Sequence, residues 1–308
     1  MDGILPLRKP VGMTSHDCVN EIRRMTGERR VGHAGTLDPQ VGGVLPICLG
    51  QATRVIEYLH EETKMYNAVC LVGYSTQTED HTGLLLEKAA KLPEITEEEA
   101  RSVLSTFLGE IEQTPPMYSA VKVKGKRLYE WAREGIVVER PARKVTIHDL
   151  TLQKIGEWEG YPTIHFQVTC SKGTYIRTLC VDIGQKWGMP AHMLFLERIK
   201  SGPFFLEETY TFEQIASAIA QGTFESLLLP IDHALVHYPA CEIGEQERFN
   251  IMNGQTIVFP NKSGWNQGDL FRVYSCDGKF LALYEVSHFR QLENGNVMYG
   301  KPVKVFHL

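Results

Sequence analysis

The pattern of apolar and polar residues predicts both strands and helices in this chain. Polar and apolar residues alternate along residues 163–170, the period of two expected of a half-buried strand, and residues 65–72 also predict a strand, which carries Tyr66. A helix is expected to follow residue 175 and to run to about Trp187. It would place Arg177 near a helix N-terminus, a position that favours anions.

Further helices are predicted from their capping residues. Residues 14–26 start with a Thr-Ser N-cap and carry acids early and arginines late, with Gly27 as the stop. Residues 211–222 begin with the Thr-x-x-Gln pattern of a capping box and end at a glycine. The acidic run after Thr96 predicts a capped helix rather than a metal site, because its apolar residues form one stripe: Ala100, Val103, Leu104, Phe107 and Leu108.

The character of the chain changes after Tyr238 and Pro239. Short strand-like runs and an Asp-Gly hairpin signal replace the longer elements and predict a separate small β domain. We therefore expect an α+β domain over residues 1–238 and a β domain over 239–308. The strands expected in the second domain are 256–259, 270–274, 280–286 and 303–306.

The composition of the 308 residues is that of an ordinary globular protein, 43% hydrophobic and 22% charged. No run of about eighteen apolar residues occurs and the N-terminus does not resemble a signal peptide, so we expect no membrane span and a cytoplasmic location. The seven cysteines are odd in number and form no Cys-x-x-Cys pair, which predicts reduced core residues.

Neither a metal nor a nucleotide cofactor is expected. His60 and Glu61 start like the helix of a zinc protease, but the second histidine is missing where the metal would need it. The glycine-rich loops that hold nucleotide phosphates are also missing from the sequence.

Charge is unevenly distributed along the chain. The formal net charge is −5, yet eight basic residues stand against three acids between residues 119 and 147, and nine acids stand against three bases over residues 79–112. One face of an acidic protein can therefore be basic, as nucleic-acid binding requires.

Residues 31–39 place a histidine and a carboxylate among glycines and are predicted to be neither helix nor strand. Asp38 precedes Pro39, whose ring disfavours helical dihedrals before it, and the glycines allow close approach of a ligand. A carboxylate presented in this way can act as a nucleophile or a base. Taken alone, the Leu-Asp-Pro segment also fits an ordinary turn.

Four segments resemble, in order and spacing, the TruB family of tRNA pseudouridine synthases. A fifth segment, from Pro116 to Arg133, is similar to that family's RNA-gripping insertion, expected here at about residues 115–145. The four segments are Lys9-Pro10-x-Gly12-Met13-Thr14-Ser15, Gly32-His33-x-Gly35-Thr36-Leu37-Asp38-Pro39, Lys64-x-Tyr66 and Lys172-Gly173-Thr174-Tyr175-Ile176-Arg177-Thr178-Leu179.

The resemblance implies a fold and a reaction. The fold would be an α+β catalytic domain with a mixed, mostly antiparallel sheet and a central cleft, followed by a PUA-like β domain. The reaction would be the isomerisation of uridine to pseudouridine at position 55 in the T loop of tRNA, in which uracil leaves its N1 bond and reattaches through C5. The target base must first be flipped out of the stack, and no cofactor or metal is required.

The resemblance also implies roles for individual residues. Asp38 would be the nucleophile, either adding to the base or acting at the sugar, and Arg177 would pair with it and favour its charged form. His33 would fill the space that the base vacates, and Tyr66 would stack on the uracil. Individually, these last three residues also fit a surface ion pair, a structural loop histidine and a core tyrosine, respectively.

Other positions receive supporting roles from the same resemblance. Tyr175 would line the pocket and assist removal of the C5 proton, Leu196 would add apolar lining, and Asp80 would have a structural role. The chain departs from the family at Val41, where a small residue is frequent, and at Glu197, where a basic residue is frequent. Both departures put the contacts around Leu196 in doubt.

The basic insertion is expected to contact RNA. Its cations alternate with aromatic residues, a combination that suits phosphate contacts and base stacking, although a solvated charged helix has the same composition. The C-terminal domain would contact the acceptor end of the tRNA. The expected RNA contacts are Lys122, Lys126, Arg127 and Arg133.

Two other functions remain open from the sequence. One is a tRNA-binding or tRNA-folding protein whose catalysis is secondary or lost. The other is a guide-dependent pseudouridine synthase that acts on ribosomal RNA within a complex. The single chain without long basic tails favours a stand-alone tRNA enzyme that needs no protein partner.

Overall fold

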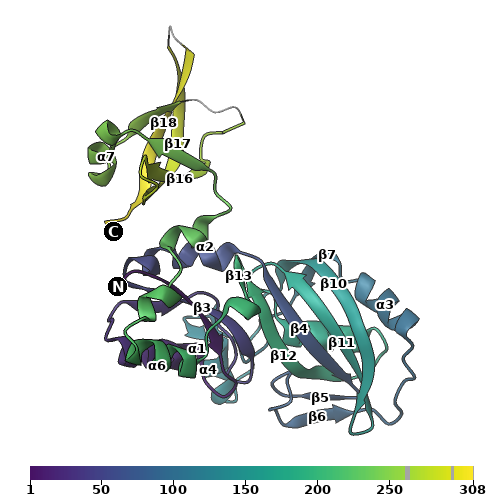
Figure 1. The fold of residues 1–308 in the computed structure, drawn as a ribbon. Coiled ribbons are helices and arrows are strands. Elements are labelled where there is room, and N and C mark those ends of the chain that lie inside the picture. The colour runs from purple at the N-terminus through teal and green to yellow at the C-terminus, as the bar shows by residue number, and fades with distance from the viewer. Residues whose placement is uncertain (261–263, 293–294, 308) are drawn as a thin grey trace.

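A computed structural model gives the fold of residues 1–260, 264–292 and 295–307. Figure 1 shows a large N-terminal part built on a long curved sheet and a smaller C-terminal part that stands beside it. Within the described residues, no helix is long and apolar enough to cross a membrane.

The large part is organised around a nine-stranded sheet. Along the main path the strands are β1 (Gly3–Lys9), β3 (Gly42–Leu49), β12 (Ala191–Ser201), β4 (Lys64–Val72), β11 (Tyr161–Cys170), β10 (Arg143–Trp158) and β7 (Gly109–Gln113). Two short strands pair at the side of this path, β2 (Val31–His33) with β3 and β13 (Phe204–Phe205) with β12. The β12–β3 pair is parallel, whereas the other pairs of this sheet are antiparallel. The expected mixed, mostly antiparallel sheet is confirmed.

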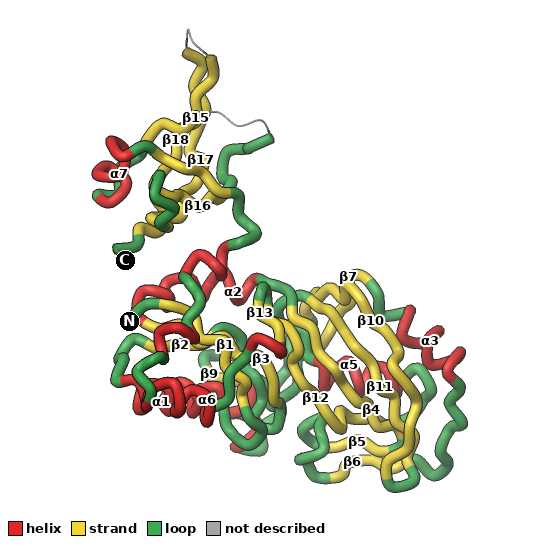
Figure 2. Tube along the Cα trace, in the orientation of Figure 1, coloured by secondary structure: helices red, strands yellow, loops and turns green. Residues whose placement is uncertain are grey.

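Helices pack on both halves of the sheet (Figure 2). The α-helices of the large part are α1 (Ser15–Thr26), α2 (Ile56–Glu61), α3 (Glu97–Ser105), α4 (Leu128–Arg133), α5 (Ile176–Gln185) and α6 (Phe212–Ala220). The 3-10 helices are η1 (Gly50–Val55), η2 (Leu206–Glu208), η3 (Phe224–Leu227) and η4 (Ile231–Leu235). Helices α1 and α6 share an apolar cluster with β1 and β3, and α3 and α5 share another with β4, β10, β11 and β12. The chain therefore has one core for each half of the sheet.

Two small hairpins extend from the large part. The strands β5 (Tyr74–Thr76) and β6 (Leu85–Lys88) form one of them, and β8 (Lys122–Val123) and β9 (Lys126–Arg127) form the other, directly before α4. The second hairpin and α4 lie within the segment that resembles an RNA-gripping insertion.

Where the structure describes it, the C-terminal part contains a five-stranded sheet of order β14-β16-β17-β18-β15 and the helix α7. Its elements are β14 (Ala240–Ile243), α7 (Glu245–Met252), β15 (Ile257–Pro260), β16 (Leu270–Ser275), β17 (Phe280–Leu292) and β18 (Gly295–Val305). The β14–β16 pair is parallel and the other pairs are antiparallel. This sheet has its own apolar core around Phe259, Phe271 and Tyr284.

An apolar cluster also joins the two parts. Phe280, Leu283 and Phe306 of the C-terminal part are buried together with Ile4 and Val44 of the large part. Polar contacts surround this cluster: Arg54 stacks on the Phe306 ring at 5.1 Å, Lys304 pairs with Glu57 at 2.7 Å, and Gln51 contacts the backbone of His307.

The predicted helices and strands are confirmed in most places. Helix α1 follows a Thr14 capping box and ends at Gly27, whose φ of 72° lies in the left-handed region, and α6 has the predicted Thr211–Gln214 box. Strands β4 and β11 occupy the predicted positions.

Several predictions need correction. Residues 31–33 form strand β2, because their backbone pairs with residues 47–49 of β3. Helix α3 ends at Ser105 and leaves Leu108 exposed, and α5 ends before Trp187. Cys276 is exposed, whereas the other six cysteines are buried as predicted.

Candidate active site

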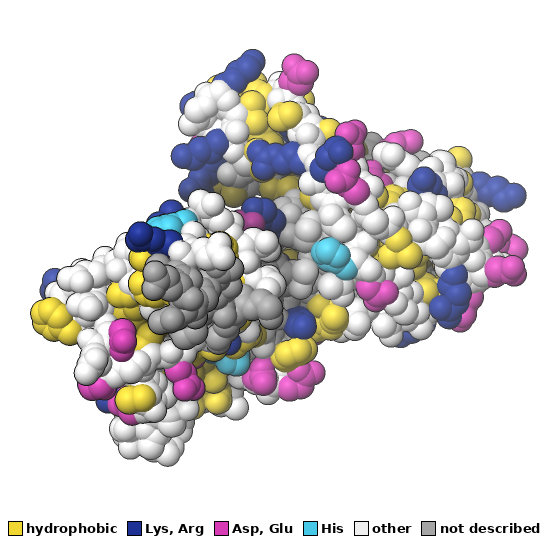
Figure 3. All heavy atoms as spheres, turned by 90° about the horizontal axis from the view of Figure 1, so that it is seen from above, with side chains coloured by type: hydrophobic (Ala, Val, Ile, Leu, Met, Phe, Trp, Pro, Cys, Tyr) yellow, Lys and Arg dark blue, Asp and Glu magenta, His cyan; other side chains and the backbone are white. Residues whose placement is uncertain are grey.

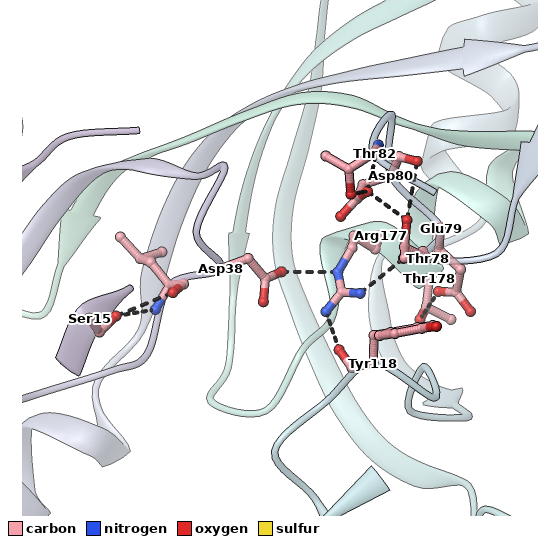
Figure 4. Close-up of polar contacts among 10 residues, drawn as sticks. Ser15, Asp38, Thr78, Glu79, Asp80, Thr82, Tyr118, Arg177 and Thr178 are labelled. Carbon is pink, nitrogen blue, oxygen red and sulfur yellow. Dashed lines mark hydrogen bonds and ion pairs between the residues drawn. The ribbon is translucent and has the colours of Figure 1, made fainter. Parts of the chain in front are cut away.

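Asp38 and Arg177 form an ion pair in which one partner is buried and the other is accessible. Arg177 Nε lies 3.0 Å from Asp38 Oδ2, and the side chains are 5% and 40% exposed, respectively (Figure 4). Arg177 comes from the first turn of α5, directly after the Tyr175 N-cap, and Asp38 comes from the loop that follows β2. The Asp38 carboxylate is therefore accessible to solvent, and the buried guanidinium of Arg177 holds it in place.

The other two nitrogens of Arg177 are held by backbone carbonyls. Nη1 donates to the Thr78 carbonyl at 2.9 Å and Nη2 to the Tyr118 carbonyl at 2.8 Å. Because a guanidinium is planar and its donors point in fixed directions, these two bonds set the direction of the Nε–H that faces Asp38.

Asp80 stabilises the turn that carries the Thr78 carbonyl. One of its carboxylate oxygens accepts hydrogen bonds from the Thr78 hydroxyl at 2.7 Å and from the Thr82 hydroxyl and backbone N–H at 2.6 and 2.9 Å. Burial opposes ionisation of Asp80, but these hydrogen bonds outweigh it and lower the pKa of Asp80 below its ordinary value. The structural role expected for Asp80 is therefore confirmed.

The loop that carries Asp38 is anchored through its backbone. The Leu37 N–H donates to the Ser15 hydroxyl at 2.9 Å, Lys9 Nζ donates to the Pro39 and Val41 carbonyls at 3.2 and 2.8 Å, and Arg198 Nη2 donates to the Gly35 carbonyl at 2.9 Å. Lys9 and Arg198 are each only 1% exposed. Two buried cations and the first residue of α1 therefore fix the loop on both sides of Asp38.

His33 ends β2 as a neutral imidazole. Burial lowers the pKa of His33 from 6.5 to about 4, and the nearby His60 and Arg198 add to this effect. Its Nδ1 is buried and has no hydrogen-bond partner in the described part of the chain. Within the described residues, Nδ1 of this neutral imidazole is therefore left without a hydrogen bond.

The remaining pocket candidates lie on β4, on β12 and before α5. Tyr66 on β4 is the cross-strand partner of Arg198, and burial raises the pKa of its hydroxyl. Leu196 is buried in the apolar cluster that also contains Leu37, and Tyr66 packs against that cluster. The backbone of Tyr175 exchanges two hydrogen bonds with the Gln113 side chain, at 3.0 and 3.2 Å.

The two departures from the family pattern also have defined places. Val41 is buried in the same cluster as Leu196, and its N–H donates to the Asp38 carbonyl at 3.0 Å. Glu197 lies 3.5 Å from Arg8 and lines a hollow of about 290 Å³ next to Lys9 and Gly43. Neither residue disturbs the Asp38–Arg177 pair.

The basic insertion combines cations with aromatic rings. Lys126 lies 4.6 Å from the Trp131 ring and pairs with Glu134 at 2.9 Å, and Arg133 lies 5.2 Å from the Tyr129 ring. The view from above shows Lys and Arg side chains gathered on the lobe at the top of the picture (Figure 3). The insertion is linked to the candidate site through the Tyr118 carbonyl.

Among the described residues, no group of three or more His, Cys, Asp or Glu side chains is arranged to hold a metal ion. The charged side chains that hold Asp38 and the backbone of its loop are cations instead. They are Lys9, Arg177 and Arg198, each of which donates to backbone carbonyls.

Sequence reasoning missed some residues that shape the site. Lys9 and Ser15 stand in one of the segments that resemble the family, but nothing in that segment indicates that they anchor the loop. No sequence pattern indicates a role for Arg198. Lys64 is buried as well: it donates to three backbone carbonyls, and burial lowers its pKa to about 8.

Models of three protein families match consecutive parts of the chain. The model described as TruB family pseudouridylate synthase (N terminal domain) matches residues 23–176. The tRNA pseudouridylate synthase B C-terminal domain matches residues 177–236, and the model described as Pseudouridine synthase II TruB, C-terminal, matches residues 239–286. Together they cover most of the chain.

Curated relatives and solved structures agree with the family models. The tRNA pseudouridine synthase B of Halalkalibacterium halodurans is 50% identical over 92% of this chain and 93% of its own length, and that of Bacillus subtilis is 47% identical over 92% and 93%. A solved H/ACA RNP bound to a substrate RNA containing 2′-deoxyuridine matches 99% of this chain and 85% of its own, with a TM-score of 0.76 and 26% identity. A Cbf5-Nop10-Gar1 complex matches 98% and 84%, with a TM-score of 0.74 and 29% identity. The chain therefore belongs to the TruB family of pseudouridine synthases, isomerases that convert uridine in tRNA to pseudouridine.

Proposed function

We propose that this enzyme isomerises uridine 55 in the T loop of tRNA and that Asp38 is its nucleophile. The observation that carries the proposal is the Asp38–Arg177 pair: an accessible carboxylate held at 3.0 Å by a buried guanidinium. A nearby fixed guanidinium holds the carboxylate in the direction in which it can act as a nucleophile.

The proposed reaction needs no external reagent. The bond between C1′ and N1 of the uridine breaks, a bond between C1′ and C5 forms, the C5 proton leaves to solvent, and N1 takes up a proton. Asp38 forms a transient bond to the base or to the sugar. Tyr175, the N-cap residue of α5 two positions before Arg177, lines the pocket and assists removal of the C5 proton.

Base flipping precedes the chemistry, at a cost of roughly a few kcal/mol. His33 occupies the space of the flipped base as a neutral imidazole whose buried Nδ1 has no protein partner in the described residues. Tyr66 stacks on the uracil, and Leu196 adds apolar lining. Leu196 belongs to the apolar cluster that contains Leu37, the residue before Asp38, and Tyr66 packs against that cluster.

The RNA contacts are divided between two parts of the chain. The insertion at about residues 115–145 contacts the T arm through Lys122, Lys126, Arg127 and Arg133. A PUA-like domain over residues 239–308 contacts the acceptor end, and the catalytic domain comprises residues 1–238. The enzyme works in the cytoplasm without an obligatory protein partner or a cofactor.

The test measures tritium released from uracil C5 of an unmodified tRNA transcript by the purified chain alone. We expect release from the parental protein and none above background from Asp38→Asn, with tRNA affinity changed by less than about tenfold, roughly 1.4 kcal/mol. Asp149→Asn, at an exposed aspartate on β10, is the matched control and should keep the parental rate.

Other results would support other functions. No release by the parental chain, with tRNA still bound, would favour a binding protein or an enzyme that needs guide RNA and partners. Release by Asp38→Asn at the parental rate would remove Asp38 from the role of nucleophile.

A further inference from the structure

Glu79 has a backbone conformation that is unusual for its residue type. It lies in the turn between β5 and β6, and its φ of 63° falls in the left-handed region that favours glycine. A non-glycine residue persists in this region only where the surrounding structure holds it.

Three elements hold Glu79 in this conformation. Its carboxylate accepts a hydrogen bond at 2.9 Å from the hydroxyl of Thr178 on α5. Its backbone carbonyl accepts one from Met193 on β12 at 3.0 Å, and its N–H donates to Thr76 at the end of β5 at 3.2 Å. The side chain is therefore one link from this turn to α5, beside the bond from Arg177 to the Thr78 carbonyl.

That link runs beside the bond that orients Arg177. The residue before Glu79 supplies the Thr78 carbonyl that accepts from Arg177, and the residue after Arg177 supplies the hydroxyl that holds Glu79 (Figure 4). The same turn and the same helix start are thus joined by two adjacent hydrogen bonds. Loss of the Glu79–Thr178 bond frees the turn and, with it, the carbonyl that sets the direction of the guanidinium.

We propose that Glu79 is a positioning residue for Arg177, which it keeps aligned with Asp38 through Thr178 and the Thr78 carbonyl. The inference rests on the proposed role of Asp38 as nucleophile. It also explains why a glutamate occupies a backbone position that glycine would adopt without strain: glycine has no side chain to reach α5.

The hydrogen bond between Thr178 and Glu79, rather than the negative charge of Glu79, is what holds the turn to α5. Burial raises the pKa of Glu79, against the lowering effects of the Thr178 hydrogen bond, Arg177 and Arg140, and Asp80 beside it raises the pKa further. Burial also raises the pKa of Asp182, one turn further along α5, to about 6, with Glu79 contributing. A glutamine keeps an oxygen that can accept from Thr178 and carries no charge to desolvate, so it should preserve the alignment.

The experiment compares variants of the full-length chain in the tritium-release assay on unmodified tRNA. We expect Glu79→Gly and Thr178→Val each to lower kcat by about 10- to 100-fold, the scale expected of a misplaced catalytic group, while KM for tRNA stays within about twofold. The double variant should lose no more than either single variant, because both remove one interaction.

Two further variants separate positioning from a merely structural role. Glu79→Gln should keep kcat within about threefold of the parent. Glu159→Gly is the matched control, since Glu159 is an exposed glutamate with a φ of 50° in the β10–β11 hairpin, and it should keep the parental kcat. Thermal unfolding of each variant shows whether the assayed protein is folded.

The following outcomes would contradict the positioning role of Glu79. A folded Glu79→Gly variant with parental kcat overturns the positioning role, as does a Glu79→Gln variant as slow as Glu79→Gly, or a loss in the double variant equal to the product of the single losses. Asp38→Asn in the same assay keeps the two proposals distinct: if it is inactive while Glu79→Gly is unaffected, only the positioning role fails.

Discussion

The burial of Arg177 determines how strongly its ion pair with Asp38 can contribute to stability. An ion pair at the surface contributes about 1 kcal/mol at most, because water and salt screen it. Arg177 is 5% exposed and its other nitrogens already bond to two carbonyls, so its charge is fixed behind the carboxylate and poorly screened. A lysine, with a single ammonium group, would not reproduce three bonds in fixed directions.

His33 should make stability depend on pH in acid. Its pKa falls from 6.5 to about 4 on folding, so between these values the unfolded chain binds a proton that the folded chain does not. This contribution is complete above pH 6.5 and is lost as the pH falls toward about 4. We expect His33→Asn to flatten the decline of the unfolding free energy over this range, measured by urea denaturation. Equal slopes for variant and parent would contradict the assignment of a buried neutral imidazole.

At the residue scale the candidate site residues could be named from the sequence, whereas the residues that support them could not. Asp38, His33 and Arg177 stand in motifs whose residue types signal chemistry, and the structure brings Asp38 and Arg177 into contact. Lys9 and Arg198 are charged, and charged residues are ordinarily exposed, so only the fold reveals that they donate to carbonyls from the interior.

Helices whose ends are marked by capping residues in their own sequence were predicted well. Helix α1 has its cap, its charges and its glycine stop within its own sequence. Helix α7 has only Ile251 buried and therefore no apolar stripe that could reveal it. Strand β18 begins at Gly295, well before the predicted 303–306, because pairing with β17 and β15 extends it. Non-local pairing of this kind leaves little trace in a short window of sequence.

Gly43 marks the point where β3 and β12 run parallel, opposite Arg198. Its φ is 109°, and a Cβ atom there would lie 2.2 Å from the Arg198 carbonyl oxygen. We expect Gly43→Ala to destabilise the protein by about 3 kcal/mol or more. Gly188→Ala, at a φ of 64° with open space around the position, should cost only about 1–2 kcal/mol. Similar losses in chemical denaturation would mean that the contact with Arg198 relaxes easily.

The β8–β9 hairpin offers a test of RNA contact by the insertion. Lys122 is exposed on β8, and if it contacts a phosphate, Lys122→Ala should weaken tRNA binding and reduce the slope of log K against log salt by about 1. Lys91→Ala, at an exposed lysine before α3, should leave the slope unchanged. A Lys122→Ala variant with the parental slope would favour a solvated charged hairpin.

The two parts of the molecule share one apolar cluster, so their separation has two effects. Deletion of residues 239–308 removes Phe280, Leu283 and Phe306 from that cluster. It also exposes the residues of the large part that pack against them. We expect the shortened chain to unfold at a lower temperature and to bind tRNA more weakly, while it still releases tritium from an isolated T-arm hairpin. Complete loss of hairpin activity in a folded fragment would mean that the domain boundary lies elsewhere.

The anchoring of the Asp38 loop through its main chain has a consequence for how the enzyme can change. Ser15, Lys9 and Arg198 bond to N–H and C=O groups, which every residue except proline supplies in full, so the loop keeps its shape whatever side chains it carries outward. Thr36 and Gln40 are exposed on either side of Asp38. Substitution of either side chain should therefore leave the carboxylate in place, because none of these anchoring bonds involves the side chain of Thr36 or Gln40.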